Sequence, residues 1–104
     1  MERSIKMNKT ITWNQHHYEV IKNYREAFHE EDFIERVTEY FEDYDYIVGD
    51  IAYGKLRLKG FYDPTNKKAN KINNYKNLEQ YLKKNCAVDC KYFVLKKKEK
   101  INEV

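Results

Sequence analysis

The sequence predicts an α+β domain in which two helices pack on one face of a mostly antiparallel sheet of four or five strands. Three observations lead to this fold class. Strand-like and helix-like segments follow the order β-α-β-β-α-β after one extra N-terminal strand. That order is typical of a ferredoxin-like, split βαβ arrangement. The 104 residues, 41% of them hydrophobic, are enough for one core and one domain.

The first half of the chain predicts a hairpin followed by a long helix. Residues 10–13 and 17–22 are rich in β-forming side chains, and Asn14 and Gln15 separate them at the spacing of a two-residue turn. Apolar residues then recur at helical spacing through residues 30–44. Acidic side chains occupy the opposite face of this predicted helix, namely Asp32, Glu35, Glu39 and Glu42.

The second half predicts a central strand pair, a short helix and a last strand. Residues 46–49 and 55–62 enclose a turn, and Pro64 ends the second strand because proline donates no ladder hydrogen bond. Residues 63–66 are expected to form a turn, and residues 67–74 a polar, mobile loop. Asn77 suits the start of a short helix, and residues 91–97 are expected to complete the sheet.

The expected organisation is a flexible arm, one domain and a charged tail, over residues 1–9, 10–97 and 98–104 respectively. No segment is long and apolar enough to cross a membrane, and the N-terminal residues lack the hydrophobic centre of a secretion signal. Two cysteines without such a signal predict reduced thiols in a cytoplasmic protein. We therefore expect a cytoplasmic domain with no membrane contact.

Charge is divided unevenly between the two halves of the chain. Residues 1–54 carry twelve Asp/Glu and six Lys/Arg, whereas residues 55–104 carry five and fourteen. Because alternate residues of a strand share one face, the second central strand predicts a cationic and partly aromatic surface. Its members are Lys55, Arg57, Lys59 and Phe61, with Lys96, Lys97 and Lys98 of the last strand expected beside them.

Such a surface favours RNA, because cations contact phosphates and an aromatic ring stacks on a base. The sequence therefore predicts a non-enzymatic accessory protein that binds RNA or a ribonucleoprotein through this basic sheet face. The alternative is an adaptor or self-associating module that binds a basic protein, or a second copy, through the acidic helix 30–44. Ordinary solvation of both charged faces is a third interpretation.

Other candidate chemistries are incomplete in this sequence. Cys86 and Cys90 supply two of the four ligands that zinc needs, or a reversible thiol pair, or two small apolar groups for packing. Asp45, Asp50 and Asp63 flank the central strands, but no further carboxylate completes a divalent-cation site. We expect no catalytic residues, no metal and no cofactor.

Three stretches also resemble a known family. They are YDYIVGD at residues 44–50, YGKLRLKGF at 53–61 and CAVDCKYFVLKK at 86–97. They are similar to the YutD-like family of small bacterial proteins, and the resemblance covers roughly residues 17–98. The family is largely uncharacterised and taken to be cytoplasmic. The resemblance implies a single compact domain and transfers no functional residues.

Overall fold

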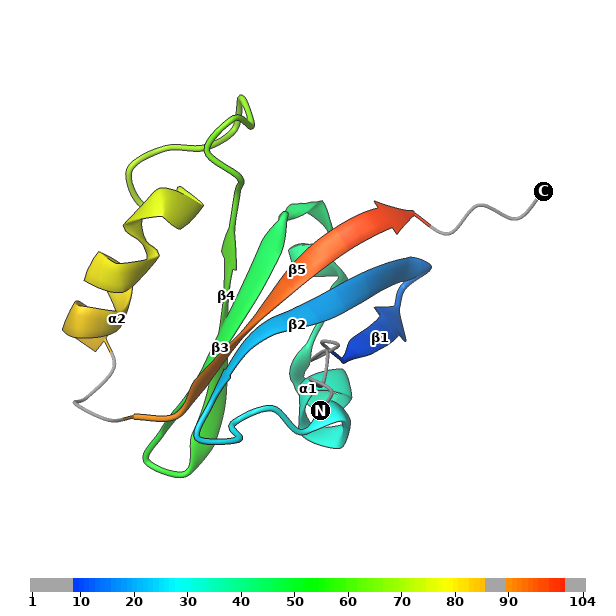
Figure 1. Cartoon of the computed structure of the whole chain (residues 1–104), viewed down its shortest axis with the longest axis vertical. Coiled ribbons are helices and arrows are strands. Elements are labelled where there is room, and N and C mark those ends of the chain that lie inside the picture. Colours follow the sequence, from blue (N-terminus) through cyan, green and yellow to red (C-terminus); the bar gives the residue numbers. More distant parts are fainter. Residues whose placement is uncertain (1–8, 86–89, 101–104) are drawn as a thin grey trace, which may run out of the picture.

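Five strands form one antiparallel sheet in the computed structural model, which describes residues 9–85 and 90–100 (Figure 1). The spatial order of the strands is β1-β2-β5-β3-β4. In chain order the elements are β1 (Thr10–Trp13), β2 (His16–Tyr24), α1 (Glu30–Arg36), the 3-10 helix η1 (Glu39–Asp43), β3 (Tyr46–Ala52), β4 (Lys55–Phe61), the 3-10 helix η2 (Tyr75–Asn77), α2 (Leu78–Asn85) and β5 (Tyr92–Lys100).

The α+β class and the antiparallel sheet are confirmed, but the ferredoxin-like arrangement is not. β5 lies between β2 and β3 and pairs antiparallel with both. β2 and β3 are therefore parallel to each other, and the segment that contains α1 connects them. In a ferredoxin-like sheet of these elements β2 would pair with β4. Here β2 pairs with β5, and β4 lies at the edge beside β3.

The two helices lie on opposite faces of the sheet, not on one face as the sequence predicted. Ile47 and Val48 are neighbours in β3, so their side chains point to opposite faces. Ile47 belongs to the buried cluster of Phe33 in α1, and Val48 belongs to that of Leu78 in α2. We call the α1 side face A and the α2 side face B. Each face has its own apolar core.

The N-terminal hairpin is confirmed, whereas the long helix over residues 30–44 is not. Asn14 and Gln15 have φ angles of 52° and 67°, the left-handed pair that a tight two-residue hairpin turn requires. α1 ends at Arg36, and the extended residues Val37 and Thr38 separate it from η1. Both are β-branched and have low helix propensity, which favours a break at this point.

Hydrogen bonds join the polar segment after β4 to two aspartates that precede β3. One Asp43 carboxylate oxygen accepts from the Tyr62 hydroxyl at 2.6 Å and from Lys68 Nζ at 2.8 Å. Asp45 accepts from the Asp63 amide at 2.7 Å and from the Asn66 side chain at 3.0 Å. Hydrogen bonding to Lys68 and then to Tyr62 lowers the pKa of Asp43. Lys68 thus connects the segment expected as a mobile loop to η1.

Candidate binding surfaces

The β4 residues predicted to bind RNA share face B, but α2 and η2 cover part of that face. Phe61 is fully buried in the face B core. Its ring packs edge-on against Tyr75 and Tyr81, with ring centroids 6.4 and 5.5 Å away. A ring enclosed in this way cannot stack on a nucleotide base. The sequence placed Phe61 on the correct face and gave no sign that a helix covers it.

Arg57 is engaged within the protein. Its Nε donates to a carboxylate oxygen of Asp50 at 2.8 Å, and a terminal nitrogen donates to the Asn85 carbonyl at 2.6 Å. Asp50 is 1% exposed, and its second oxygen accepts from the Tyr81 hydroxyl at 3.5 Å. The hydrogen bond and the charge of Asp50 raise the pKa of Arg57. Arg57 joins β4 to β3 and to the negative end of α2, where a cation is favoured.

Some of the other predicted cations contact groups within the protein, and the rest are exposed on the surface. Lys59 lies over the rings of Phe61 and Tyr81, with Nζ 5.1 and 5.7 Å from the ring centroids. Lys97 points to face A and donates to the Glu42 carbonyl at 2.6 Å, whereas Lys98 pairs with Glu19 at 3.2 Å. Lys55 and Lys96 are exposed. The seven predicted residues therefore do not form one open surface.

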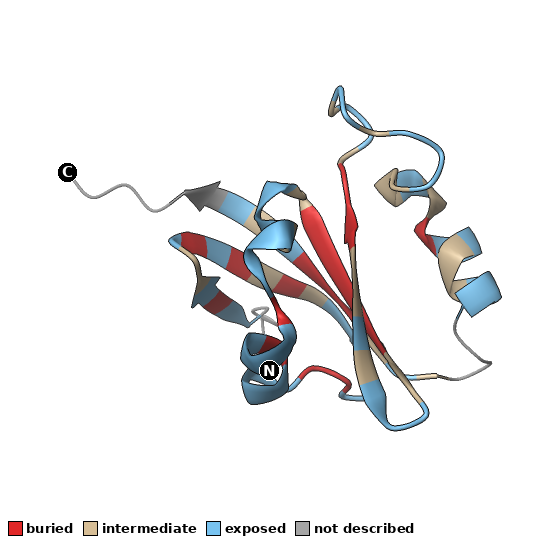
Figure 2. Cartoon of the chain, turned by 180° about the vertical axis from the view of Figure 1, so that it is seen from behind, coloured by how far each residue is buried: buried red, intermediate tan, exposed pale blue. Residues whose placement is uncertain are grey.

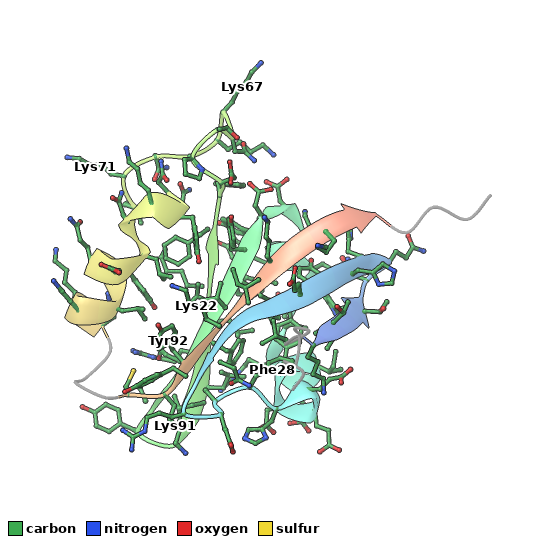
Figure 3. All side chains as sticks on the ribbon, in the orientation of Figure 1. Lys22, Phe28, Lys67, Lys71, Lys91 and Tyr92 are labelled. Carbon is green, nitrogen blue, oxygen red and sulfur yellow. The ribbon has the colours of Figure 1, made fainter. Side chains whose placement is uncertain are left out.

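A different part of face B combines exposed lysines with tyrosines. The rings of Tyr24 and Tyr92 lie on the neighbouring strands β2 and β5, with centroids 5.6 Å apart. Lys22 pairs in register with Val94, and Lys96 pairs with Glu19, on the same face. Figure 3 shows Lys22 and Tyr92 near each other on this part of the sheet. We call Lys22, Tyr24, Tyr92 and Lys96 the basic–aromatic strip.

Sequence reasoning missed this strip because its members come from opposite ends of the chain. The pairing of β2 with β5 brings them together, and the register shifts between Val20 and Lys22. Without that irregularity, Lys22 would share a face with Val20, which lies in the core of face A. No local pattern in either strand signals the shift.

The predicted acidic residues are exposed but lie on two elements. Asp32 and Glu35 belong to α1, and Glu39 and Glu42 belong to η1. Two large apolar side chains are exposed among them: Ile34 at 44% and Tyr40 at 67%. We call residues 30–43 the acidic segment. Exposed apolar groups therefore lie among the carboxylates of this segment.

The aspartates and cysteines form no metal centre where they are described. Within residues 9–85 and 90–100, no group of three or more His, Cys, Asp or Glu side chains could hold a metal ion. Cys90 is disulfide-bonded, so the reduced thiol expected there is wrong. Cys86, the other cysteine of the predicted pair, lies outside the described residues. No helix in this same part of the chain is both long and apolar enough to cross a lipid bilayer.

These observations define a small α+β domain with a five-stranded sheet, a separate core on each face and charged surfaces of both signs. The chain belongs to the YutD-like family, as the sequence resemblance implied: the model of the family described as "Putative antitoxin YutD-like" matches residues 12–96. A curated relative from Bacillus subtilis (strain 168), "Putative antitoxin YutD", is 44% identical over 80 residues, or 77% of this chain and 88% of the relative.

A solved structure supports the same assignment. The solution NMR structure of protein yutD from B. subtilis matches with a TM-score of 0.77 at 37% sequence identity. The match covers 96% of this chain and 91% of that chain. At this identity and coverage, the two chains share the fold described above.

Proposed function

We propose that this chain is an antitoxin that acts by binding a basic protein partner through the acidic segment. The antitoxin class comes from the name of the B. subtilis relative. The observation that supports the acidic segment is the exposure of Ile34 and Tyr40 among its carboxylates. Apolar anchors supply most of the affinity in a protein interface, while surrounding charges speed and orient the encounter.

Charge reversal on the acidic segment tests this proposal. The variant Glu35→Lys/Glu39→Lys is compared with Glu79→Lys, which changes an exposed carboxylate on α2. Proteins retained from a lysate of the source organism by the immobilised wild-type chain are quantified for each variant. We expect a basic partner that is lost with the double variant, kept with Glu79→Lys and insensitive to nuclease.

The antitoxin activity is then measured in cells. The captured partner is expressed alone and together with each variant of this chain. We expect growth to slow with the partner alone and to recover with the wild type and with Glu79→Lys, but not with the double variant. Equal partner retention, or equal recovery of growth, with the double variant and with Glu79→Lys would exclude the acidic segment as the binding surface.

RNA or ribonucleoprotein binding is the second candidate, and one observation favours it. In the basic–aromatic strip the Tyr24–Tyr92 ring pair lies at one end and the exposed Lys22 and Lys96 follow it along the strands, which suits single-stranded RNA. Fluorescence polarisation with a labelled single-stranded RNA at two salt concentrations measures this binding. Loss in Lys22→Ala/Lys96→Ala, with retention in Lys83→Ala/Lys84→Ala on α2, would support it. Equal binding by both variants would indicate nonspecific attraction by lysines.

A further inference from the structure

β4 is an edge strand with backbone groups directed away from the sheet. It pairs with β3 on one side and lies last in the strand order. The Ile51 amide donates to the Lys91 carbonyl, so Ile51 bonds toward the β5 side of β3. Because successive residues of a strand direct their backbone groups to opposite sides, its neighbour Asp50 bonds toward β4. The register pairs Asp50 with Arg57, which turns the backbone groups of Leu56 and Leu58 outward.

These outward groups are accessible. Within the part of the chain that the structure describes, no backbone hydrogen bond joins Leu56 or Leu58 to a segment beyond the strand ladder. Figure 2 shows β4 in front, between α1 on one side and α2 on the other, with no ribbon drawn over its lower half. An accessible edge of this kind can accept an added strand.

A hollow adjoins the edge on face A. It has a volume of about 320 Å³ and is lined by Arg36, Phe41, Leu56, Arg57 and Leu58. Leu56 and Leu58 are half-buried, so their outer surfaces contribute apolar wall to the hollow. A strand added beside β4 would direct alternate side chains toward face A. One apolar side chain of that strand would enter the hollow.

The charges of β4 determine which strand fits. Lys55, Arg57 and Lys59 alternate along its face B side, and only Arg57 is paired with a carboxylate among them in the described residues. A second copy of β4 added antiparallel and centred on Arg57 would place Arg57 opposite Arg57 and Lys55 opposite Lys59. Directly opposed like charges destabilise strand pairs. An acidic strand would instead be attracted to Lys55 and Lys59.

We propose that the β4 edge binds an extended, acidic segment of a protein partner by strand addition. The segment forms main-chain hydrogen bonds with Leu56 and Leu58, inserts an apolar side chain into the hollow and directs carboxylates toward Lys55 and Lys59. The acidic segment contributes Arg36 and Phe41 to the hollow, but the proposal does not involve its carboxylates, so its failure would leave the proposed function untouched. The competing interpretation is that Lys55 and Lys59 only protect the edge strand from aggregation.

A short synthetic peptide that alternates Glu and Val is the probe, and one that alternates Lys and Val is its control. Amide hydrogen exchange is followed by NMR on the full chain. We expect the Glu–Val peptide to slow exchange about tenfold at Leu56 and Leu58 and to leave the edge strand β1 unchanged at Thr12. No protection at β4, equal protection at Thr12, or equal action of both peptides would overturn the proposal.

Two variants separate the backbone contribution from the charge contribution. Leu58→Pro removes an outward amide while leaving the ladder to β3 intact, and Leu58→Val keeps that amide. We expect binding to be lost in the first and kept in the second. Lys55→Glu/Lys59→Glu should shift the preference to the Lys–Val peptide. A preference that does not shift would show that β4 charge does not select the partner, and would refute the inference even if Leu58→Pro failed to fold.

Discussion

Replacing Arg57 with methionine should destabilise the protein strongly, because it leaves a buried carboxylate without its cation. Asp50 is 1% exposed, and its remaining side-chain contact is the Tyr81 hydroxyl at 3.5 Å. Removing one partner from a fully buried ion pair costs about 3–5 kcal/mol. The Arg57 side chain is 46% exposed, so water already screens the pair. We therefore expect a loss of about 2 kcal/mol, less than for a fully buried pair.

Urea denaturation followed by the fluorescence of Trp13 measures this loss. Lys55→Met is the matched control, because Lys55 is exposed on the same strand and its replacement should cost less than about 0.5 kcal/mol. Asp50→Asn/Arg57→Met should recover part of the loss, since no charge is then buried. Equal stability of Arg57→Met and Lys55→Met would refute the structural role of the pair. Any binding assay that relies on Arg57 variants must therefore include a stability measurement.

Four further variants test stability. In Gly49→Ala the new Cβ would lie 2.2 Å from Cζ of the buried Phe93, so we expect a loss of about 3 kcal/mol by urea denaturation. Gly54→Ala meets open space but has φ +75°, so it should lose only about 1 kcal/mol. Tyr53 is fully exposed at φ 53°, and Tyr53→Asn should gain about 0.5–1 kcal/mol, measured as a higher Tm. The buried Tyr18 hydroxyl has no hydrogen-bond partner in the described residues, so Tyr18→Phe should be neutral or stabilising by about 1 kcal/mol. Burial raises the pKa of Tyr18 from 10.0 to about 12, so its contribution is complete below pH 10 and is lost as pH rises to 12. Alkaline denaturation should therefore be less steep in Tyr18→Phe; an unchanged slope would contradict this.

Local features were predictable from the sequence, whereas their arrangement was not. The Asn14–Gln15 turn and the second hairpin were found because each depends on residues that are neighbours in the chain. The insertion of β5 between β2 and β3 depends on pairing across most of the chain, which no local pattern encodes. Helical periodicity also continued through Val37 and Thr38, because Phe41 beyond the break still packs against the core of face A.

For the candidate surfaces too, local features were predictable from the sequence and their arrangement was not. Strand alternation correctly placed Arg57 and Phe61 on one face, since the period of a strand is a local property. Alternation cannot show whether a helix covers that face, and the rings of Tyr75 and Tyr81 bury Phe61. The sequence likewise grouped Lys97 with its two neighbours, although alternation directs it to the opposite face, where it contacts Glu42.

Positive side chains of β4 lie close to negative side chains of α1, and this arrangement suits a protein partner better than RNA. Lys55 of β4 lines the same hollow of about 430 Å³ as Asp32 and Glu35 of α1. A nucleic acid laid along β4 would bring its phosphates to these carboxylates and lose part of the attraction of the lysines. A protein can present an acidic strand to β4 and a basic surface to α1 at once. Complementary charges of both signs would then fix its orientation, which a uniform polyanion cannot do.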